Sequence, residues 1–144
     1  MPEDKATTMR EFVKAMAAGE VEKALSCTAD EPVWATPLGT YEGKEAVKSS
    51  LTSMAKNMKD MKVTETGNGI IVHGDKAFFE HILSGTYQGK KFEFLAMCAY
   101  EFSGDKIKKM RTTYDRLLMA QQVTPWFGRP VINMIVGQSA KAVK

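Results

Sequence analysis

The sequence has few cysteines, no long apolar run and no block of charge of one sign. Its two cysteines, Cys27 and Cys98, are typical of reduced thiols rather than of a disulfide framework. No stretch reaches the length needed to cross a bilayer, and Met1–Arg10 carries charges where a secretory signal has an apolar run. The net charge is only +3, and the lysines are spread along the chain. We therefore expect a cytoplasmic protein with no transmembrane segment and no nucleic-acid partner.

Signatures of bound metals and phosphates are also missing. His73 and His81 lack carboxylate or thiolate partners at the spacing of a metal site, and no Gly-rich phosphate loop is present. The sequence thus predicts neither a metal nor another cofactor.

The composition is that of a chain with one core. Hydrophobic residues make up 44% of the 144 positions, and no Pro/Gly/Ser linker divides them. We expect a principal domain over residues 1–123 and a helical extension over residues 124–144.

The first sixty residues predict three helices and two short β segments. Apolar residues recur at helical spacing around Phe12 and Met16, and Lys44–Met58 has an apolar stripe that we interpret as core packing. The expected elements are a helix ended by Gly19, a short helix from Val21, β segments over 32–38 and 40–42, and the helix from Lys44.

Residues 63–118 predict four antiparallel strands. Phe92–Phe102 alternates almost without fault, with aromatic and weakly polar residues on one face and no carboxylate among them. A two-residue turn at Gln88-Gly89 sets the register of the hairpin around it. The expected pairs are Tyr87 with Lys90, Leu83 with Phe94, His81 with Ala96, and Phe79 with Cys98.

Two other turns complete the predicted register. The turn at His73–Lys76 pairs Val72 with Ala77 and Ile70 with Phe79. For Met110, Thr112 and Tyr114 to share the inner face, the loop Ser103–Asp105 has to contain three residues, because a two-residue turn reverses the parity.

Several short segments resemble a known superfamily when taken together. They are Phe12-Val13, Ala18–Val21, Trp34–Pro37, Gly39–Val47 and Lys106–Asp115. Over residues 9–123 the chain resembles the nuclear transport factor 2-like cone, which ketosteroid isomerase, polyketide cyclases of the SnoaL type and limonene epoxide hydrolase share. The resemblance implies an α+β fold: a cone-shaped, curved antiparallel sheet against three N-terminal helices, here with an added C-terminal helix. It does not choose among isomerases, cyclases, dehydratases, hydrolases and proteins that only bind.

The catalytic positions of two of these families carry no catalytic group here. The ketosteroid isomerase tyrosine falls at Phe12, its base aspartate at Thr36 and its second oxyanion-hole acid at about Cys98. The final-strand acid of the epoxide hydrolases falls at Thr112. Steroid isomerisation by that route is therefore not expected.

The inner face of the predicted sheet leaves two candidate catalytic residues. His81 is suited to proton transfer near pH 7, and the phenol of Tyr114 to polarising a carbonyl. The alternative is that His81 is a core residue bonded to a hydroxyl, and the tyrosines and Trp34 are open to the same interpretation. Expected ligand-binding residues are Phe12, Met16, Trp34, Thr36, Leu51, Phe79, Leu83, Phe94, Ala96, Cys98, Tyr100, Met110 and Thr112.

The C-terminal segment reads as an amphipathic helix after a break at Pro125–Pro130. It either covers the sheet's outer face around Leu95 and Met97, lies across a partner, or attaches to a membrane surface through Trp126 and Phe127; the first is favoured. We expect a homodimer. Asp115 is expected in an ion pair with Arg111 or Arg116.

Three functions stay open. The chain is an enzyme for a small apolar carbonyl or polyketide-like compound, a module that binds an apolar metabolite unchanged, or a dimerisation domain with a filled cone.

Overall fold

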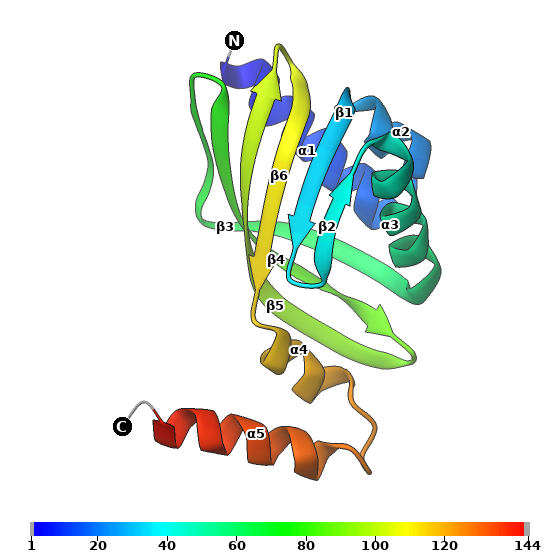
Figure 1. Ribbon diagram of the computed structural model, residues 1–144, viewed down its shortest axis with the longest axis vertical. Coiled ribbons are helices and arrows are strands. Elements are labelled where there is room, and N and C mark those ends of the chain that lie inside the picture. Colours follow the sequence, from blue (N-terminus) through cyan, green and yellow to red (C-terminus); the bar gives the residue numbers. More distant parts are fainter. Residues whose placement is uncertain (1, 143–144) are drawn as a thin grey trace.

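The computed structural model describes residues 2–142 as five helices and one six-stranded sheet (Figure 1). The helices are α1 (Pro2–Ala18), α2 (Val21–Ser26), α3 (Lys44–Asn57), α4 (Arg116–Val123) and α5 (Arg129–Ala142). The strands are β1 (Thr28–Thr36), β2 (Gly39–Glu42), β3 (Met58–His73), β4 (Lys76–Tyr87), β5 (Lys90–Ser103) and β6 (Lys106–Tyr114).

The strands lie in the order β2-β1-β6-β5-β4-β3, and every neighbouring pair is antiparallel except β1 and β6. Helices α1 to α3 cover one face of this curved sheet (Figure 1). The predicted α+β class, with a curved sheet against three N-terminal helices and an added C-terminal helix, is confirmed.

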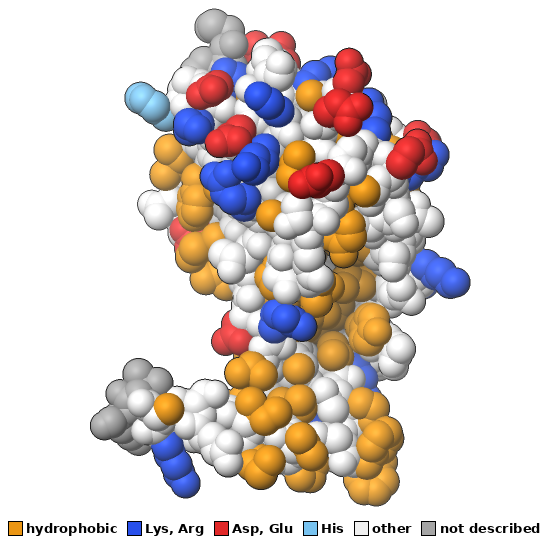
Figure 2. Space-filling view, in the orientation of Figure 1, with side chains coloured by type: hydrophobic (Ala, Val, Ile, Leu, Met, Phe, Trp, Pro, Cys, Tyr) orange, Lys and Arg blue, Asp and Glu red, His pale blue; other side chains and the backbone are white. Residues whose placement is uncertain are grey.

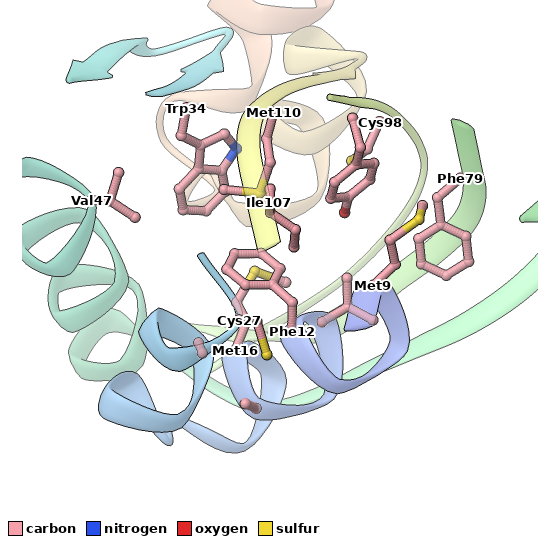
Figure 3. Packing of buried hydrophobic residues seen from close by; sticks show 14 of the residues in the cluster. Met9, Phe12, Met16, Cys27, Trp34, Val47, Phe79, Cys98, Ile107 and Met110 are labelled. Atoms are coloured by element: carbon pink, nitrogen blue, oxygen red, sulfur yellow. The ribbon is translucent and has the colours of Figure 1, made fainter. Parts of the chain in front are cut away.

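The core lies between α1 and the concave face of the sheet. Phe12 meets Trp34 edge to face, with ring centroids 6.1 Å apart, and Met110 lies beside them (Figure 3). Helix α1 ends where the sequence predicts, because Gly19 takes a φ of +75° that other residues rarely adopt. The Gly19 N–H then donates to the Met16 carbonyl and the Glu20 N–H to the Ala15 carbonyl, which closes the helix end.

The predicted hairpin registers are confirmed. His81 pairs with Ala96 and Phe79 with Cys98 around the Gln88-Gly89 turn. Both turn residues have positive φ, as the turn type that matches the twist of a two-residue hairpin requires. Ile70 likewise pairs with Phe79 on the other side of β4.

The predicted three-residue loop before β6 is wrong. Ser103 pairs with Lys106, so the turn has two residues, but Glu101 pairs with Lys109 while Phe102 pairs with Ile107. Lys108 is therefore the extra residue of a β-bulge, which restores the parity that the short turn reverses. The inner-face pairs Cys98 with Thr112 and Ala96 with Tyr114 follow, as expected from the alternation.

Other strand limits also differ from the prediction. The first of the four meander strands begins at Met58, and the last ends at Tyr114 instead of continuing to Leu118. The chain then enters α4, a helix that the sequence did not reveal, and Asp115 caps it by accepting the Leu118 N–H at 3.0 Å. The ion pair expected for Asp115 at a rim or dimer contact does not form within residues 2–142, where the carboxylate instead caps the helix.

Strand β1 spans Thr28–Thr36 instead of 32–38. It begins early because Thr28 already pairs with Ile107 on β6. It ends at Thr36, whose hydroxyl accepts the Leu38 N–H and so favours a turn over continued pairing.

Helix α5 does not cover its own sheet. It lies at the foot of the molecule beyond α4 (Figure 1), and Leu95 and Met97 on the outer face stay 44% and 36% exposed. The favoured packing of the C-terminal helix is therefore wrong within one chain. No helix in the described part of the chain is both long and apolar enough to cross a membrane.

Candidate functional site

A cavity of about 90 Å³ lies inside the cone, between the concave face of the sheet and helices α1 and α3. Its walls are almost entirely apolar, and no carboxylate or ammonium group is among the lining side chains. Most of the residues expected to contact a ligand are at its wall: Phe12, Met16, Trp34, Thr36, Leu83, Phe94, Ala96, Cys98, Tyr100, Met110 and Thr112, together with His81 and Tyr114.

Two of the expected ligand-binding residues lie elsewhere. Leu51 is buried in the core beneath α3 and does not reach the cavity. Phe79 is equally buried, at the base of a separate groove between α1 and β3. Both point to the correct side of their elements, but neighbouring side chains separate them from the open space.

Sequence reasoning missed some lining residues. These are Val13, Leu38, Tyr41, Ser50, Met54 and Met58. Met54 and Met58 belong to the predicted apolar stripe of α3, so their periodicity could have placed them on the inner side. Leu38 and Tyr41 come from the β1–β2 hairpin, where no periodic pattern indicates direction.

The polar atoms of the wall form a short chain of hydrogen bonds. The Trp34 Nε1–H donates to Thr112 Oγ1 at 2.9 Å, and that oxygen lies 3.3 Å from Cys98 Sγ, where either group can donate. Trp34 and Thr112 are 78 positions apart and meet because β1 and β6 are adjacent. The indole and hydroxyl thus satisfy each other inside an apolar wall.

The ionisable groups of the wall are uncharged near neutral pH. Burial raises the pKa of the Cys98 thiol, although a hydrogen bond with Thr112 opposes part of the shift. Burial also raises the pKa of Tyr100 well above its usual value of 10.0, with the nearby Cys98 thiol as a further cause. The pKa of Tyr114 is raised by burial as well, against a smaller opposing effect of Arg116. Cys98 is therefore a thiol, and neither phenol is a base.

His81 is the exceptional group of the cavity wall. Its side chain is only 3% exposed, stacks on Phe79 with ring centroids 4.5 Å apart, and has an Nδ1 atom with no hydrogen-bond partner among residues 2–142. Burial lowers its pKa from 6.5, and a hydrogen bond with the Phe79 backbone offsets part of the shift. The ring is thus neutral at pH 7, and its Nδ1 is left unpaired.

Phe12, Thr36, Cys98 and Thr112 all reach the cavity wall. These are the positions at which the resemblance placed the catalytic groups of ketosteroid isomerase and of the epoxide hydrolases. At these positions the acids and the phenol of those enzymes are replaced by groups that do not perform the same chemistry. No group of three His, Cys, Asp or Glu side chains suited to a metal ion is found in the described residues.

The family model described as a SnoaL-like domain matches residues 9–110. The chain belongs to this family. The match covers α1 to the middle of β6 and so includes nearly all of the cavity wall. No curated protein matches the chain.

Solved structures show the same fold at low sequence identity. A protein of Catenulispora acidiphila with a ketosteroid isomerase-like fold, in complex with trimethylamine, is 16% identical with a TM-score of 0.73, over 80% of this chain and 90% of that one. A limonene epoxide hydrolase-like enzyme of Mycobacterium tuberculosis is 14% identical with a TM-score of 0.74, over 94% and 98%. TsrD of Streptomyces laurentii is 18% identical with a TM-score of 0.75, over 86% and 97%. The SnoaL-like chain described here therefore has the nuclear transport factor 2-like fold that the sequence resembled.

Proposed function

We propose that this SnoaL-like protein binds a small, uncharged, mainly apolar molecule in the cavity, and that His81 holds the molecule's polar group. One observation carries the proposal: His81 lines the cavity, and its Nδ1 is buried without a hydrogen-bond partner among residues 2–142. Buried polar atoms are rarely left unpaired, because desolvation without a hydrogen bond costs about 1–3 kcal/mol. A bound hydroxyl or carbonyl would supply the missing bond.

The cavity wall also limits the charge and size of the molecule. Since no charged side chain lines the cavity, an ionised ligand would lose its hydration without compensation. The volume of about 90 Å³ is well below the roughly 300–1,000 Å³ typical of drug-sized ligands. A compact molecule is thus favoured.

An enzymatic role is the stronger form of the proposal. A neutral His81 would take or return a proton beside a carbonyl group that Tyr114 polarises, as an isomerase, cyclase, dehydratase or hydrolase of a small carbonyl compound requires. The cavity volume disfavours a polyketide-like substrate. The alternative is a module that binds an apolar metabolite unchanged. The open cavity disfavours the third candidate, a dimerisation domain with a filled cone.

Binding is tested by NMR titration with three probes of one shape: cyclohexanol, cyclohexanone and cyclohexane. His81→Phe keeps a ring of similar size. We expect it to weaken the binding of the alcohol and of the ketone about 10-fold and to leave the binding of the hydrocarbon unchanged. Ala96→Phe fills the cavity and should abolish all binding, whereas Met97→Phe on the outer face is the matched control. Equal binding of the alcohol and the ketone by wild type and His81→Phe would refute the role of His81.

Catalysis is tested with the ketone in D₂O. If His81 acts as a base, wild type should accelerate exchange of the protons beside the carbonyl, and both His81→Phe and Tyr114→Phe should lose that acceleration. Binding without accelerated exchange would support the binding module instead.

The proposed working unit is a homodimer. The outer face of the sheet exposes the apolar side chains of Ile71, Leu95 and Met97 in a single chain. Contact with a second copy would remove this apolar surface from water. Light scattering coupled to size exclusion measures the mass directly, and a monomer at all concentrations would overturn this part of the proposal.

A further inference from the structure

The C-terminal arm, which we define as residues 124–142, carries much of the exposed apolar surface of the chain. Five of the ten large apolar side chains that are exposed in the described residues belong to it. Trp126 and Phe127 are 80% and 70% exposed, and α5 adds Val131, Met134 and Ile135 (Figure 2). Apolar side chains gathered in this way mark an interaction surface, because a soluble chain rarely leaves them in water together.

The exposed apolar residues of α5 form one stripe. Val131, Met134 and Ile135 are spaced by three and four positions, which places them on one side of a helix. Lys141 follows Met134 by two helical turns and therefore lies on the same side. Asn133 is exposed on a different side. The stripe thus has a cation at its C-terminal end.

The positive charge of the chain is concentrated in the same region. Residues 116–144 contain four of the 20 lysines and arginines and none of the 17 aspartates and glutamates. The residues before them therefore hold 16 cations against 17 acids, so the net positive charge of the chain comes from its C-terminal end. Arg129 and Lys141 have no ion-pair partner among the side chains that the structure describes. A partner that complements this region carries negative charge.

The position of α5 allows a flat surface to reach it. The helix lies across one end of the molecule, beyond α4 and clear of the sheet (Figure 1). A plane that touches this end would meet α5 along its length before it meets the sheet. An amphipathic helix bound to a bilayer lies in the plane of the interface in the same way, with its apolar side chains inserted between the lipids.

We infer that the C-terminal arm docks on the surface of an anionic phospholipid bilayer. Trp126, Phe127 and the stripe of α5 insert at the level of the headgroups, while Arg129 and Lys141 are attracted to the anionic lipids. Contact between the arms of two copies is less favourable, because it brings cations together and neither arm has an acid to pair with them. The inference goes beyond the proposed function, since it involves none of the cavity residues.

Sedimentation of the full-length chain with lipid vesicles tests the inference. Wild type should bind vesicles made of equal parts of phosphatidylglycerol and phosphatidylcholine about 10-fold more strongly than vesicles of phosphatidylcholine alone. The double variant Trp126→Ser/Phe127→Ser should lose at least about 10-fold in binding to the anionic vesicles. Ile71→Ser, which removes an exposed apolar side chain from the sheet, is the matched control and should bind like wild type. Circular dichroism verifies that each variant is folded.

Two further pairs of variants locate the contact. Lys141→Glu should weaken binding to the anionic vesicles about 10-fold, whereas Lys14→Glu, which makes the same change in net charge on α1, should have a much smaller effect. Met134→Gln should weaken binding more than Asn133→Gln, because only Met134 lies on the stripe.

Several outcomes would overturn the inference. It is wrong if wild type binds neither kind of vesicle, or if the Trp126→Ser/Phe127→Ser variant binds as wild type does. Equal binding to the two kinds of vesicle would contradict the preference for anionic lipid, and equal effects of Lys141→Glu and Lys14→Glu would contradict a role of the arm in it. If wild type ignores vesicles but forms a dimer in light scattering that the double variant loses, the arm docks on a second copy instead.

Discussion

The side-chain amide of Gln122 makes both main-chain hydrogen bonds of Glu93. The Glu93 N–H donates to Gln122 Oε1 at 2.6 Å, and Gln122 Nε2 donates to the Glu93 carbonyl at 2.9 Å. Strand β6 ends its pairing at Tyr114, opposite Ala96, so the backbone of β5 at Glu93 has no strand neighbour on that side. An amide from α4 takes the place of a strand and fixes α4 to the sheet.

Gln122→Met removes the two hydrogen bonds to the Glu93 main chain while keeping the length of the side chain. We expect a loss of about 1 kcal/mol in the free energy of unfolding, because the bonds are solvent-accessible and water replaces them in part. Urea titration measures the loss, and faster hydrogen exchange at the Glu93 amide locates it. Gln121→Met, at the adjacent position of α4, is the control. Equal effects of the two substitutions would show that the amide does not anchor the helix.

Thr112→Val keeps the shape of the side chain but removes the oxygen that Trp34 and Cys98 share. The Trp34 Nε1–H would then be buried without an acceptor, and we expect a cost of about 1–3 kcal/mol in the free energy of unfolding. Trp34→Phe in the Thr112→Val background removes that orphaned donor. A double-mutant cycle in urea should therefore give a combined effect smaller than the sum of the single effects. Strict additivity would contradict the coupling seen in the structure.

The stability of the protein should fall on mild acidification, and His81 should contribute to the fall. Burial lowers the pKa of His81 from 6.5 in the folded state, so between that lower value and 6.5 the unfolded chain binds more protons than the folded one. The stabilising contribution is thus fully present above about pH 6.5 and is lost as the pH falls toward the folded pKa.

The measurement is the unfolding free energy by urea titration from pH 7.5 to pH 5. His81→Phe should flatten this part of the profile, whereas the substitution His73→Asn, at an exposed position, should leave it unchanged. The prediction fails if wild type and His81→Phe have parallel profiles.

Deletion of Lys108 should lower the free energy of unfolding far more than its substitution. Without the extra residue of the bulge, the two faces of the segment from Lys109 to Tyr114 would be exchanged. Met110 and Thr112 would then lie on the outer face of the sheet, and Arg111 on the inner face. The combined loss of core burial and burial of a charge exceeds about 4 kcal/mol, enough to unfold a domain of ordinary stability. Lys108→Ser keeps the residue count and should remain folded by circular dichroism. A folded deletion variant with native thermal stability would contradict the role of the bulge.

The strand faces and hairpin registers followed from local patterns in the sequence. Alternation along Phe92–Phe102 and the Gln88-Gly89 turn were sufficient to place His81 beside Ala96, because a strand period of two leaves only two choices of face. The same argument failed at the β5–β6 turn, where parity indicated an additional residue but not its position. The sequence favoured a longer loop, whereas the strand accommodates Lys108 as a bulge.

The cavity wall was predictable residue by residue only in part. Side chains on strands were assigned to the inner face by alternation, but whether Leu51 or Met54 reaches the cavity depends on how deeply α3 packs against the sheet. That depth is set by the volumes of side chains from distant parts of the chain. The capping role of Asp115 and the helix that follows were missed for a related reason, since α4 has no buried residue to create an apolar period.

The local sequence pattern was enough to determine the α+β class, the inner and outer faces of the meander and the resemblance that the family match confirms. These properties depend on turns and on periods of two and 3.6 residues, which neighbouring residues impose on one another. Only the tertiary structure decided that Trp34 bonds Thr112, that His81 Nδ1 has no partner within residues 2–142, and that α5 stands clear of its own sheet. Those outcomes depend on which groups come within reach after packing, and no local pattern encodes such distances.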